Sequence, residues 1–150
     1  MGKLLYHYYI ARQITITTTE RSGEKMDEKN IVLFEKHDGV RFVLEKSLEK
    51  YEEHVSIFSS HWHHEVQQWL KDENVDLFIT ELNPANPFGI ELSHYAREIN
   101  PNLQILWISI LGCNLYCDLR KSLGNVRCIE KPLEIEVFRH NVLHALDLLN

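Results

Sequence analysis

Apolar and polar positions alternate in a regular rhythm along the chain from Asn30 onward. Short, continuous apolar runs recur five times, and such runs are typical of strands buried on both faces. After each run, apolar residues return every three or four positions, as they do on one face of a helix. The predicted strands cover residues 31–34, 55–58, 76–80, 103–109 and 126–129. The predicted helices cover residues 40–51, 62–70, 92–99, 115–123 and 132–149.

This alternation predicts an α/β fold. Because each strand is followed by a helix, we expect a doubly wound parallel sheet of five strands with right-handed crossovers and helices on both faces. In such sheets ligands bind at the carboxyl ends of the strands, so the residues that follow each strand are the candidates for function. The candidate positions are Glu35, Lys36, Glu81, Asn83, Ser109 and Lys131.

Residues 1–30 do not share the rhythm. We predict an N-terminal extension there, flexible or loosely packed, with one β segment between residues 8 and 19 because Ile and Thr alternate in it. A polar linker is expected over residues 20–30. The folded domain is therefore expected to cover residues 31–150.

Composition narrows the classes of function. The chain has 150 residues, 44% of them apolar and 25% charged, as expected for one globular domain. The net charge of −6 repels phosphate, so we predict no nucleic-acid partner. No apolar run approaches the ~18 residues of a membrane span, so we predict no membrane partner. The cysteines Cys113, Cys117 and Cys128 are too few for a disulfide framework, and we predict reduced thiols in a cytoplasmic protein.

Histidines gather in two places. His61, His63 and His64 lie at the start of the second predicted helix, and His140 and His144 lie one turn apart on the last one. The one-turn spacing occurs in metal sites, but no carboxylate or cysteine obviously completes either group. We therefore predict surface histidines and no metal site, and keep a histidine-mediated, metal-responsive binding module as an alternative.

Tryptophans mark expected core positions. Trp62 and Trp69 share the apolar stripe of the second predicted helix, and Trp107 lies in the fourth predicted strand. Large apolar side chains at such positions are usually buried, so we predict that all three belong to the core.

The strand-end residues, in this order and spacing, resemble the receiver domain of bacterial response regulators over about residues 30–150. The most specific match is Lys131-Pro132 after the fifth strand, a bond that is usually cis in the family. The segment 76–92 also matches the family's third-strand region in length, including Gly89. The resemblance implies a flavodoxin-like (βα)5 sheet with strand order 2-1-3-4-5 and a role in two-component signalling and phosphorelay.

The site departs from the family pattern. Glu81 stands where the family has its phosphoacceptor Asp, and the family's acidic pair is here Glu35 and Lys36. Ser109 and Lys131 match the family. The resemblance therefore implies a degenerate, or pseudo-receiver, form of the domain.

These departures change the charge of the site. Glu35 and Glu81 supply two negative charges, and Lys36 and Lys131 supply two positive ones, so the expected sum is zero. Mg²⁺ prefers hard oxygen ligands, and an adjacent Lys36 ammonium would repel it by on the order of several kcal/mol. We therefore predict that Mg²⁺ binding is lost and that no cofactor is bound. Glu81 is one methylene longer than Asp, which misplaces its carboxylate by about an ångström for in-line transfer, so we predict no phosphorylation.

Two roles for Glu81 stay open. It either mimics a permanently phosphorylated Asp, held by Lys131 and Ser109, or forms a salt bridge whose role is only structural. Cys128 occupies the family's aromatic switch position on the fifth strand, so the usual switch is also compromised.

The leading hypothesis is a receiver-like signal-transduction module that lacks the phosphoacceptor Asp, is not an enzyme and acts by phosphorylation-independent protein–protein interaction. A response regulator with a relaxed but working Mg²⁺ and phosphorylation site is the alternative within the same fold. The family's usual contact surface is built by the fourth helix, the fifth strand and the fifth helix, and a homodimer through it is a second form of partnership. On this chain that surface would draw on Leu115, Tyr116, Leu119, Arg127, Ile135, Arg139 and Val142.

Overall fold

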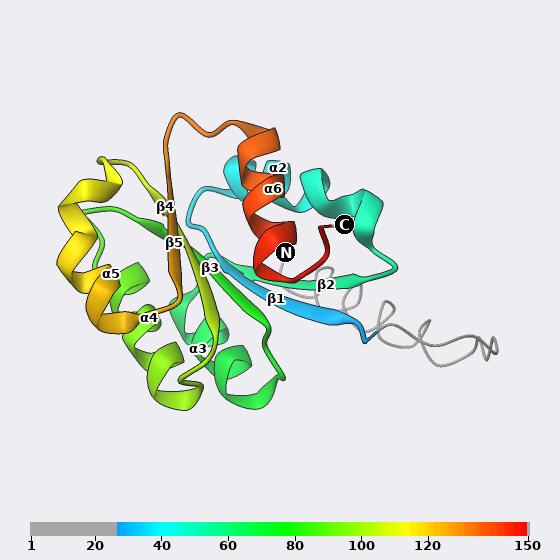
Figure 1. Ribbon diagram of the computed structural model, residues 1–150, viewed down its shortest axis with the longest axis horizontal. Helices are drawn as coiled ribbons and strands as arrows, with labels where there is room; N and C mark the ends of the chain where they lie inside the picture. The colour runs from blue at the N-terminus through cyan, green and yellow to red at the C-terminus, as the bar shows by residue number, and fades with distance from the viewer. Residues whose placement is uncertain (1–26, 150) are drawn as a thin grey trace.

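The computed structural model describes residues 27–149. The strands are β1 (Lys29–Phe34), β2 (Val55–Ser60), β3 (Leu77–Leu82), β4 (Gln104–Ser109) and β5 (Val126–Glu130). The α-helices are α2 (Asp38–Leu48), α3 (His63–Asp72), α4 (Phe88–Ile99), α5 (Cys117–Leu123) and α6 (Ile135–Ala145), and the short 3-10 helices are η1 (Glu49–Tyr51) and η2 (Cys113–Tyr116). The strands form one sheet in the order β2-β1-β3-β4-β5, with every pair parallel (Figure 1). The predicted fold class and strand order are confirmed.

The first strand begins earlier than the sequence pattern predicts. Lys29 and Asn30, which we assigned to the N-terminal extension, pair with Val55 and Ser56 of β2. The backbone N–H of Lys29 donates to the carbonyl of His54 at 2.8 Å, which fixes the start of the strand. The rest of the predicted extension, including its β segment at residues 8–19, lies outside the described residues.

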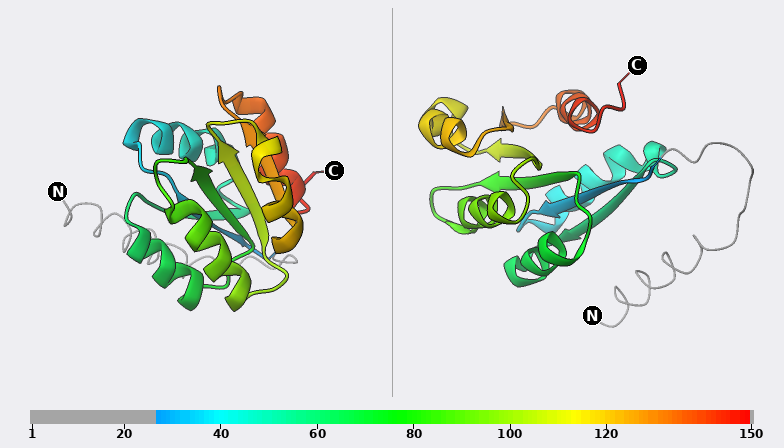
Figure 2. Two further views of the ribbon diagram at one scale, coloured as in Figure 1. Left: turned by 90° about the vertical axis from the view of Figure 1, so that its left-hand side faces the viewer. Right: turned by 60° about the horizontal axis from the view of Figure 1, so that its bottom comes forward.

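The helices cover the two faces of the sheet in separate layers. Helices α2 and α6 lie on one face, and α3, α4 and α5 lie on the other (Figures 1 and 2). On the first face, Leu44 of α2 and Phe138 of α6 pack on the strands with no exposed surface. On the second face, Val66 of α3 and Phe78 of β3 are likewise fully buried. Burying a side chain of this size contributes roughly 1.5–3 kcal/mol, so these layers hold the strand ends firmly in place.

The three tryptophans take different environments. Trp107 on β4 is fully buried, and its indole N–H donates to the hydroxyl of Ser93 on α4 at 2.9 Å. Trp69 is half-buried beside Phe58, with ring centroids 5.9 Å apart. The prediction that Trp62 belongs to the core is wrong, because its side chain is 53% exposed. Trp62 is the residue before the first turn of α3, so it does not lie on the stripe that faces the sheet.

Two helix boundaries differ from the prediction. The helix expected at residues 115–123 starts with the 3-10 helix η2 and becomes α5 only at Cys117. The last helix starts at Ile135 rather than Pro132, because Glu134 keeps an extended backbone and its carbonyl accepts the first helical bond, from Phe138. The Lys131-Pro132 peptide bond is cis, as the resemblance implies.

Within residues 27–149, no helix is both long enough and apolar enough to cross a bilayer. The longest helix, α4, has 12 residues, whereas about 20 are needed.

Candidate functional site

The strand register brings the predicted site positions to one edge of the sheet. Phe34 of β1 pairs with Thr80 of β3, Leu82 of β3 pairs with Ser109 of β4, and Ser109 pairs with Glu130 of β5. The residues next to these pairs therefore emerge close together, at the carboxyl ends of the strands, where parallel sheets bind ligands.

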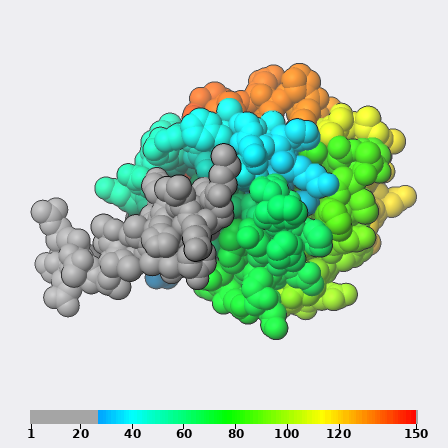
Figure 3. All heavy atoms as spheres, turned by 180° about the vertical axis from the view of Figure 1, so that it is seen from behind, coloured from blue at the N-terminus to red at the C-terminus, as the bar shows by residue number. Residues whose placement is uncertain are grey.

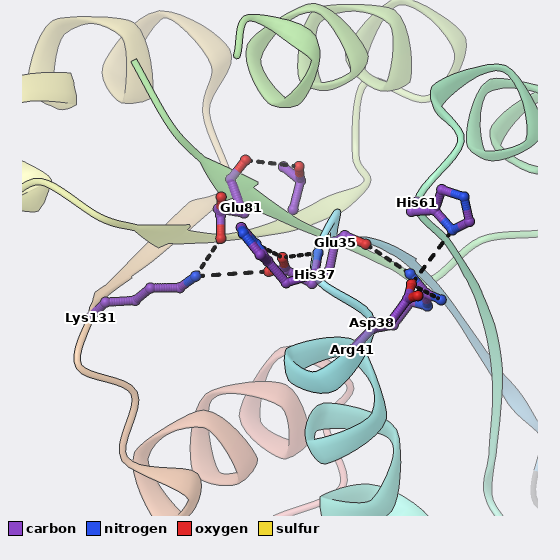
Figure 4. A network of polar contacts seen from close by, with 8 residues as sticks. Glu35, His37, Asp38, Arg41, His61, Glu81 and Lys131 are labelled. Atoms are coloured by element: carbon purple, nitrogen blue, oxygen red, sulfur yellow. Dashed lines mark hydrogen bonds and ion pairs between the residues drawn. The ribbon is translucent and has the colours of Figure 1, made fainter. Parts of the chain in front are cut away.

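Glu35, Glu81 and Lys131 form a charged cluster at this edge. The Lys131 ammonium donates to the Glu81 carboxylate in a close ion pair, and its Nζ lies 3.9 Å from Oε2 of Glu35. Figure 4 shows the lysine side chain reaching from the segment after β5 toward both carboxylates. One ammonium thus stands against two carboxylates in a site that is largely closed to water, since Glu35 is 0% exposed and Glu81 is 8% exposed.

Backbone packing fixes the position of Glu81. Gly89, in the first turn of α4, lies so close to β3 that a Cβ placed there would be 2.3 Å from the Glu81 carbonyl oxygen. Real Cβ atoms do not come that close to backbone, so only glycine fits. A glycine at position 89 therefore lets α4 pack directly against the backbone of Glu81 in the charged cluster.

The Glu35 carboxylate has an unusual environment. Its Oε1 accepts a hydrogen bond from the backbone N–H of His37 at 2.9 Å and lies 3.2 Å from Nδ1 of the His37 ring. Its Oε2 is buried without any hydrogen-bond partner. Burial raises the pKa of Glu35, and the charge of Glu81 adds to this; the His37 backbone hydrogen bond and the Lys131 charge act in the opposite direction.

Lys36 does not enter the site, which corrects our charge argument. Its side chain is exposed, and its ammonium lies 5.6 Å from the ring centroid of Phe88. Within residues 27–149, it forms no ion pair with either carboxylate of the cluster. Neighbouring residues at a strand end point to opposite sides, so Lys36 turns away from the side that Glu35 faces. With His37 neutral, the cluster then carries a net charge of −1 rather than zero.

Ser109 and Asn83 are engaged elsewhere. The Ser109 hydroxyl donates to the carbonyl of Leu111, while its own backbone carbonyl accepts from the Lys131 N–H at 2.9 Å. Oδ1 of Asn83 accepts from the backbone N–H of Ala85 at 2.9 Å and so closes the turn after β3. Neither side chain is hydrogen-bonded to Glu81 in the described part of the chain. Ser109 thus positions Lys131 through its backbone, not through its hydroxyl.

His37 is the site residue that sequence reasoning missed. Glu35, His37 and Glu81 each offer one ligand atom, and these atoms all lie within 4.8 Å of one another. The spacing in Glu35-Lys36-His37 allows this contact, since a residue two positions after Glu35 can return to the same side, but the path of the chain after β1 decides whether it does.

This donor set fits Mg²⁺ poorly. Mg²⁺ prefers oxygen ligands in octahedral geometry, and here an imidazole stands beside the two carboxylates. The loss of Mg²⁺ binding stays a prediction, with a different reason from the one drawn from Lys36.

The other histidines make no comparable group in the described residues. His61 lies 3.7 Å from the Asp38 carboxylate, so the start of α2 meets the segment just before α3, as the neighbouring blue and blue-green surfaces also show (Figure 3). The His63 ring stacks on Phe88, with centroids 4.0 Å apart. On α6, His144 Nδ1 lies 2.7 Å from the Arg127 guanidinium, and no carboxylate or cysteine joins it within residues 27–149.

The side chains of the expected contact surface differ in how accessible they are. Leu115 on η2 is 68% exposed, whereas Val142 on α6 is 0% exposed and packs in the core with Phe138. Including Val142 in the contact surface was therefore wrong: the apolar stripe of α6 faces the sheet. The remaining members of the expected surface are half-buried: Tyr116, Leu119, Arg127, Ile135 and Arg139.

The switch position is covalently held. Cys128 on β5 forms a disulfide with Cys113 on η2, with their Cα atoms 5.9 Å apart. The prediction of reduced thiols is wrong for this pair and holds for Cys117, which is free and half-buried. The two cysteines meet because the sheet brings β5 beside the segment before α5. The backbone N–H of Cys113 also donates to Glu130 at 2.9 Å.

Comparisons with known proteins agree with this architecture. No family model matches the chain. The non-phosphorylated HemR receiver domain from Leptospira biflexa has a TM-score of 0.71 at 18% identity, over 82% of this chain and 98% of that one. The CheY-like response regulator receiver domain protein from Methanospirillum hungatei JF-1 has a TM-score of 0.69 at 16% identity, over 81% and 95%. The fold is therefore that of a CheY-like receiver domain.

Sequence similarity supports the same assignment. The response regulator receiver protein CpdR of Brucella abortus (strain 2308) is 35% identical over 81 residues, which make up 54% of this chain and 66% of that protein. The match thus spans slightly less than two thirds of the relative's length. Together with the fold, this similarity supports a receiver domain of the response-regulator type.

Proposed function

We propose that this receiver domain transmits a signal through protein–protein contact without being phosphorylated. The observation that carries the proposal is the ion pair between Glu81 and Lys131 at the position where the family, by the resemblance, has its phosphoacceptor Asp. Because Lys131 already balances the charge of this carboxylate, we propose that signalling does not require a phosphoryl group.

The chemistry of phosphoryl transfer supports this view. The reaction depends on an attacking oxygen in line with the phosphorus and on cations that neutralise the developing charge. The Glu81 carboxylate is 8% exposed and bound by Lys131, and its extra methylene displaces it from the position of an Asp carboxylate. A donor would therefore have to break a buried ion pair before it could react.

The surroundings of Glu81 favour a structural salt bridge over a mimic of phosphorylated Asp. A mimic should engage both Lys131 and Ser109, because a phosphoryl group offers several acceptor oxygens. Lys131 does contact Glu81, but the Ser109 hydroxyl is directed to Leu111. One carboxylate with one partner reproduces only part of the charge and of the contacts.

The partner surface that we propose lies beside β5. Three apolar side chains in the segment between β4 and α5 are accessible: Ile110 is 41% exposed, Leu111 is 44% exposed and Leu115 is 68% exposed. Exposed apolar side chains that cluster in this way are typical of contact surfaces between proteins. A protein of the same signalling pathway, or a second copy of this chain, is the partner that such a surface would bind.

A phosphorylation assay tests the proposal directly. The full chain is incubated with acetyl phosphate and Mg²⁺, and intact-protein mass spectrometry measures the phosphoryl adduct. We expect no adduct on the wild type, and we expect that Glu81→Asp alone restores little, because Lys131 still binds the shorter carboxylate. A phosphoryl adduct on wild-type Glu81 would instead support a response regulator with a relaxed but working site.

A further inference from the structure

We propose that Glu35, His37 and Glu81 form a binding site for a divalent transition-metal ion of the Zn²⁺ class, in place of the Mg²⁺ that the fold family implies. This inference goes beyond the proposed function, because it concerns a ligand of the charged cluster and does not depend on a protein partner.

The three donors come from different elements and converge on one point. Glu35 follows β1, His37 precedes α2 and Glu81 lies in β3, yet their ligand atoms are within 4.8 Å of one another. Zn²⁺ binds oxygen and nitrogen at roughly 2.0–2.2 Å, which places neighbouring ligand atoms about 3.5 Å apart. Oε1 of Glu35 and Nδ1 of His37 already have a separation of 3.2 Å. Closure of the set therefore needs only small side-chain movements.

An independent observation points to a cation at this place. Oε2 of Glu35 is buried without a hydrogen-bond donor, although Glu35 is 0% exposed. Buried polar atoms are nearly always satisfied, and a buried carboxylate oxygen without a donor is costly. The nearest positive group is the Lys131 ammonium at 3.9 Å, beyond hydrogen-bond distance. Figure 4 shows the His37 ring and the Lys131 side chain both directed toward the Glu35 carboxylate, so an ion held there would meet this oxygen.

The donor types select the class of metal. Imidazole suits Zn²⁺, Cu²⁺, Fe²⁺ and Ni²⁺, whereas Mg²⁺ is held by oxygen atoms alone. One histidine and two carboxylates give three protein ligands and leave a position for water, an arrangement that Zn²⁺ accepts. His37 has a side chain that is 66% exposed, so the ion can enter from solvent on that side.

Lys131 competes with the ion. Its ammonium is bound to Glu81, and two cations cannot share that carboxylate without strong repulsion. Its side chain is 23% exposed and sits on a flexible four-carbon stem, so it can turn toward solvent when the ion binds. The Glu81–Lys131 pair is then the metal-free arrangement, and the metal-bound arrangement releases Lys131.

Calorimetric titration of the full chain with Zn²⁺ and with Mg²⁺ tests the site. We expect one Zn²⁺ per chain at this cluster, bound at least roughly a hundredfold more tightly than Mg²⁺, because only Zn²⁺ gains from the imidazole. His37→Ala should weaken Zn²⁺ binding at least tenfold, an effect on the order of a lost metal contact. Lys131→Gln should tighten it by roughly tenfold, since it removes the competing charge. The matched control is His140→Ala with His144→Ala, which removes the exposed histidine pair of α6 and should leave this binding unchanged.

Backbone amide shifts locate the ion, and circular dichroism verifies that each variant is folded. On addition of Zn²⁺, we expect shifts at residues 35–38 and 81–82 in the wild type and none there in His37→Ala. The proposal is overturned if Zn²⁺ binding survives His37→Ala but is lost in the α6 control variant, because the ion would then sit on surface histidines. Equal affinities for Mg²⁺ and Zn²⁺, or no Zn²⁺ binding by either the wild type or Lys131→Gln, would overturn it as well.

Discussion

The charged cluster of Glu35, Glu81 and Lys131 and the segment 110–116 lie at the same end of the sheet but are built in opposite ways. The cluster is closed to water and held together by charge, with one lysine between two carboxylates. The segment is open and apolar, with Leu115 68% exposed, and a disulfide anchors it to β5. By the resemblance, receivers switch by chemistry at the first region and signal at the second. In this chain the first region is closed to water and the second is accessible.

If the closed cluster is not phosphorylated, as we propose, a receiver can lose its chemistry and keep its fold. The sheet, the cis Lys131-Pro132 bond and the close approach of Gly89 to β3 are all present in this chain. The fold depends on packing and register, whereas the chemistry depends on a few side chains at the strand ends. The following predictions, from the largest expected effect to the smallest, test this separation.

Removing the disulfide should have the largest effect on stability. The double variant Cys113→Ser with Cys128→Ser opens a link between residues 15 positions apart, and a loop of this length corresponds to a loss of about 3 kcal/mol. Urea denaturation of the oxidised protein measures the change. Cys117→Ser is the control and should alter the free energy of unfolding by less than about 0.5 kcal/mol. An unchanged free energy in the double variant would mean that the disulfide does not hold the segment.

Gly89→Ala should disturb the charged cluster through the backbone. Its Cβ would be 2.3 Å from the Glu81 carbonyl oxygen, so α4 must shift, at a cost of about 2–3 kcal/mol. Gly39→Ala is the matched control, since nothing lies within 4 Å of its Cβ and alanine favours the helix by about 0.5–1 kcal/mol. Thermal unfolding of both variants measures the difference. Equal unfolding temperatures for Gly89→Ala and Gly39→Ala would contradict the prediction.

Lys131→Met should cost less than Gly89→Ala. It leaves the carboxylates of Glu35 and Glu81 close together without a cation, but the lysine is 23% exposed, so water compensates in part. We expect a loss of about 1–2 kcal/mol in the free energy of unfolding by urea. Lys36→Met is the control and should change stability by less than about 0.5 kcal/mol, because Lys36 is exposed and outside the cluster. Equal effects of the two variants would contradict the geometry.

Glu35→Gln should have the smallest effect, and it should be stabilising at neutral pH. Burial raises the pKa of Glu35, so the folded chain binds a proton more readily than the unfolded chain. The stability that protonated Glu35 contributes to the fold is therefore complete below the ordinary pKa of a carboxyl group. It declines as the pH rises through the raised pKa of Glu35. Glu35→Gln removes that decline. Urea denaturation at pH values from below the ordinary carboxyl pKa to above the raised one measures the free energy of unfolding of both proteins.

The control for this prediction is Glu52→Gln, which changes an exposed carboxylate and should preserve the decline. The account of Glu35 is wrong if the free energy of unfolding of Glu35→Gln falls with rising pH as much as that of the wild type.

The fold could be predicted from the sequence because its signals are local. Apolar runs and helical periodicity along residues 31–149 give the element order, and the strand-end positions place Glu81 and Lys131 at one edge. The resemblance implies the strand order, and this order brings the ends of the third and fifth strands close enough for the two side chains to pair.

Other features depend on geometry that the sequence pattern does not contain. Lys36 and His37 are adjacent, and only the path of the chain after β1 decides that His37 faces Glu35. The Cys113–Cys128 disulfide joins elements that meet only once β5 has joined the sheet. Val142 and Trp62 were misplaced because the exact start and orientation of a helix decide which residues face the core.

A titration with Mg²⁺ and beryllofluoride, followed by the backbone amide shifts of the full chain, tests the central claim most directly. Beryllofluoride imitates a phosphoryl group on an acceptor carboxylate, so it reports whether the site can be activated. We predict that the wild type shows no shifts around Glu81 and Lys131, because the Glu81 carboxylate is buried and bound by Lys131. Saturable shifts at Glu81 and Lys131 in the wild type would contradict phosphorylation-independent action.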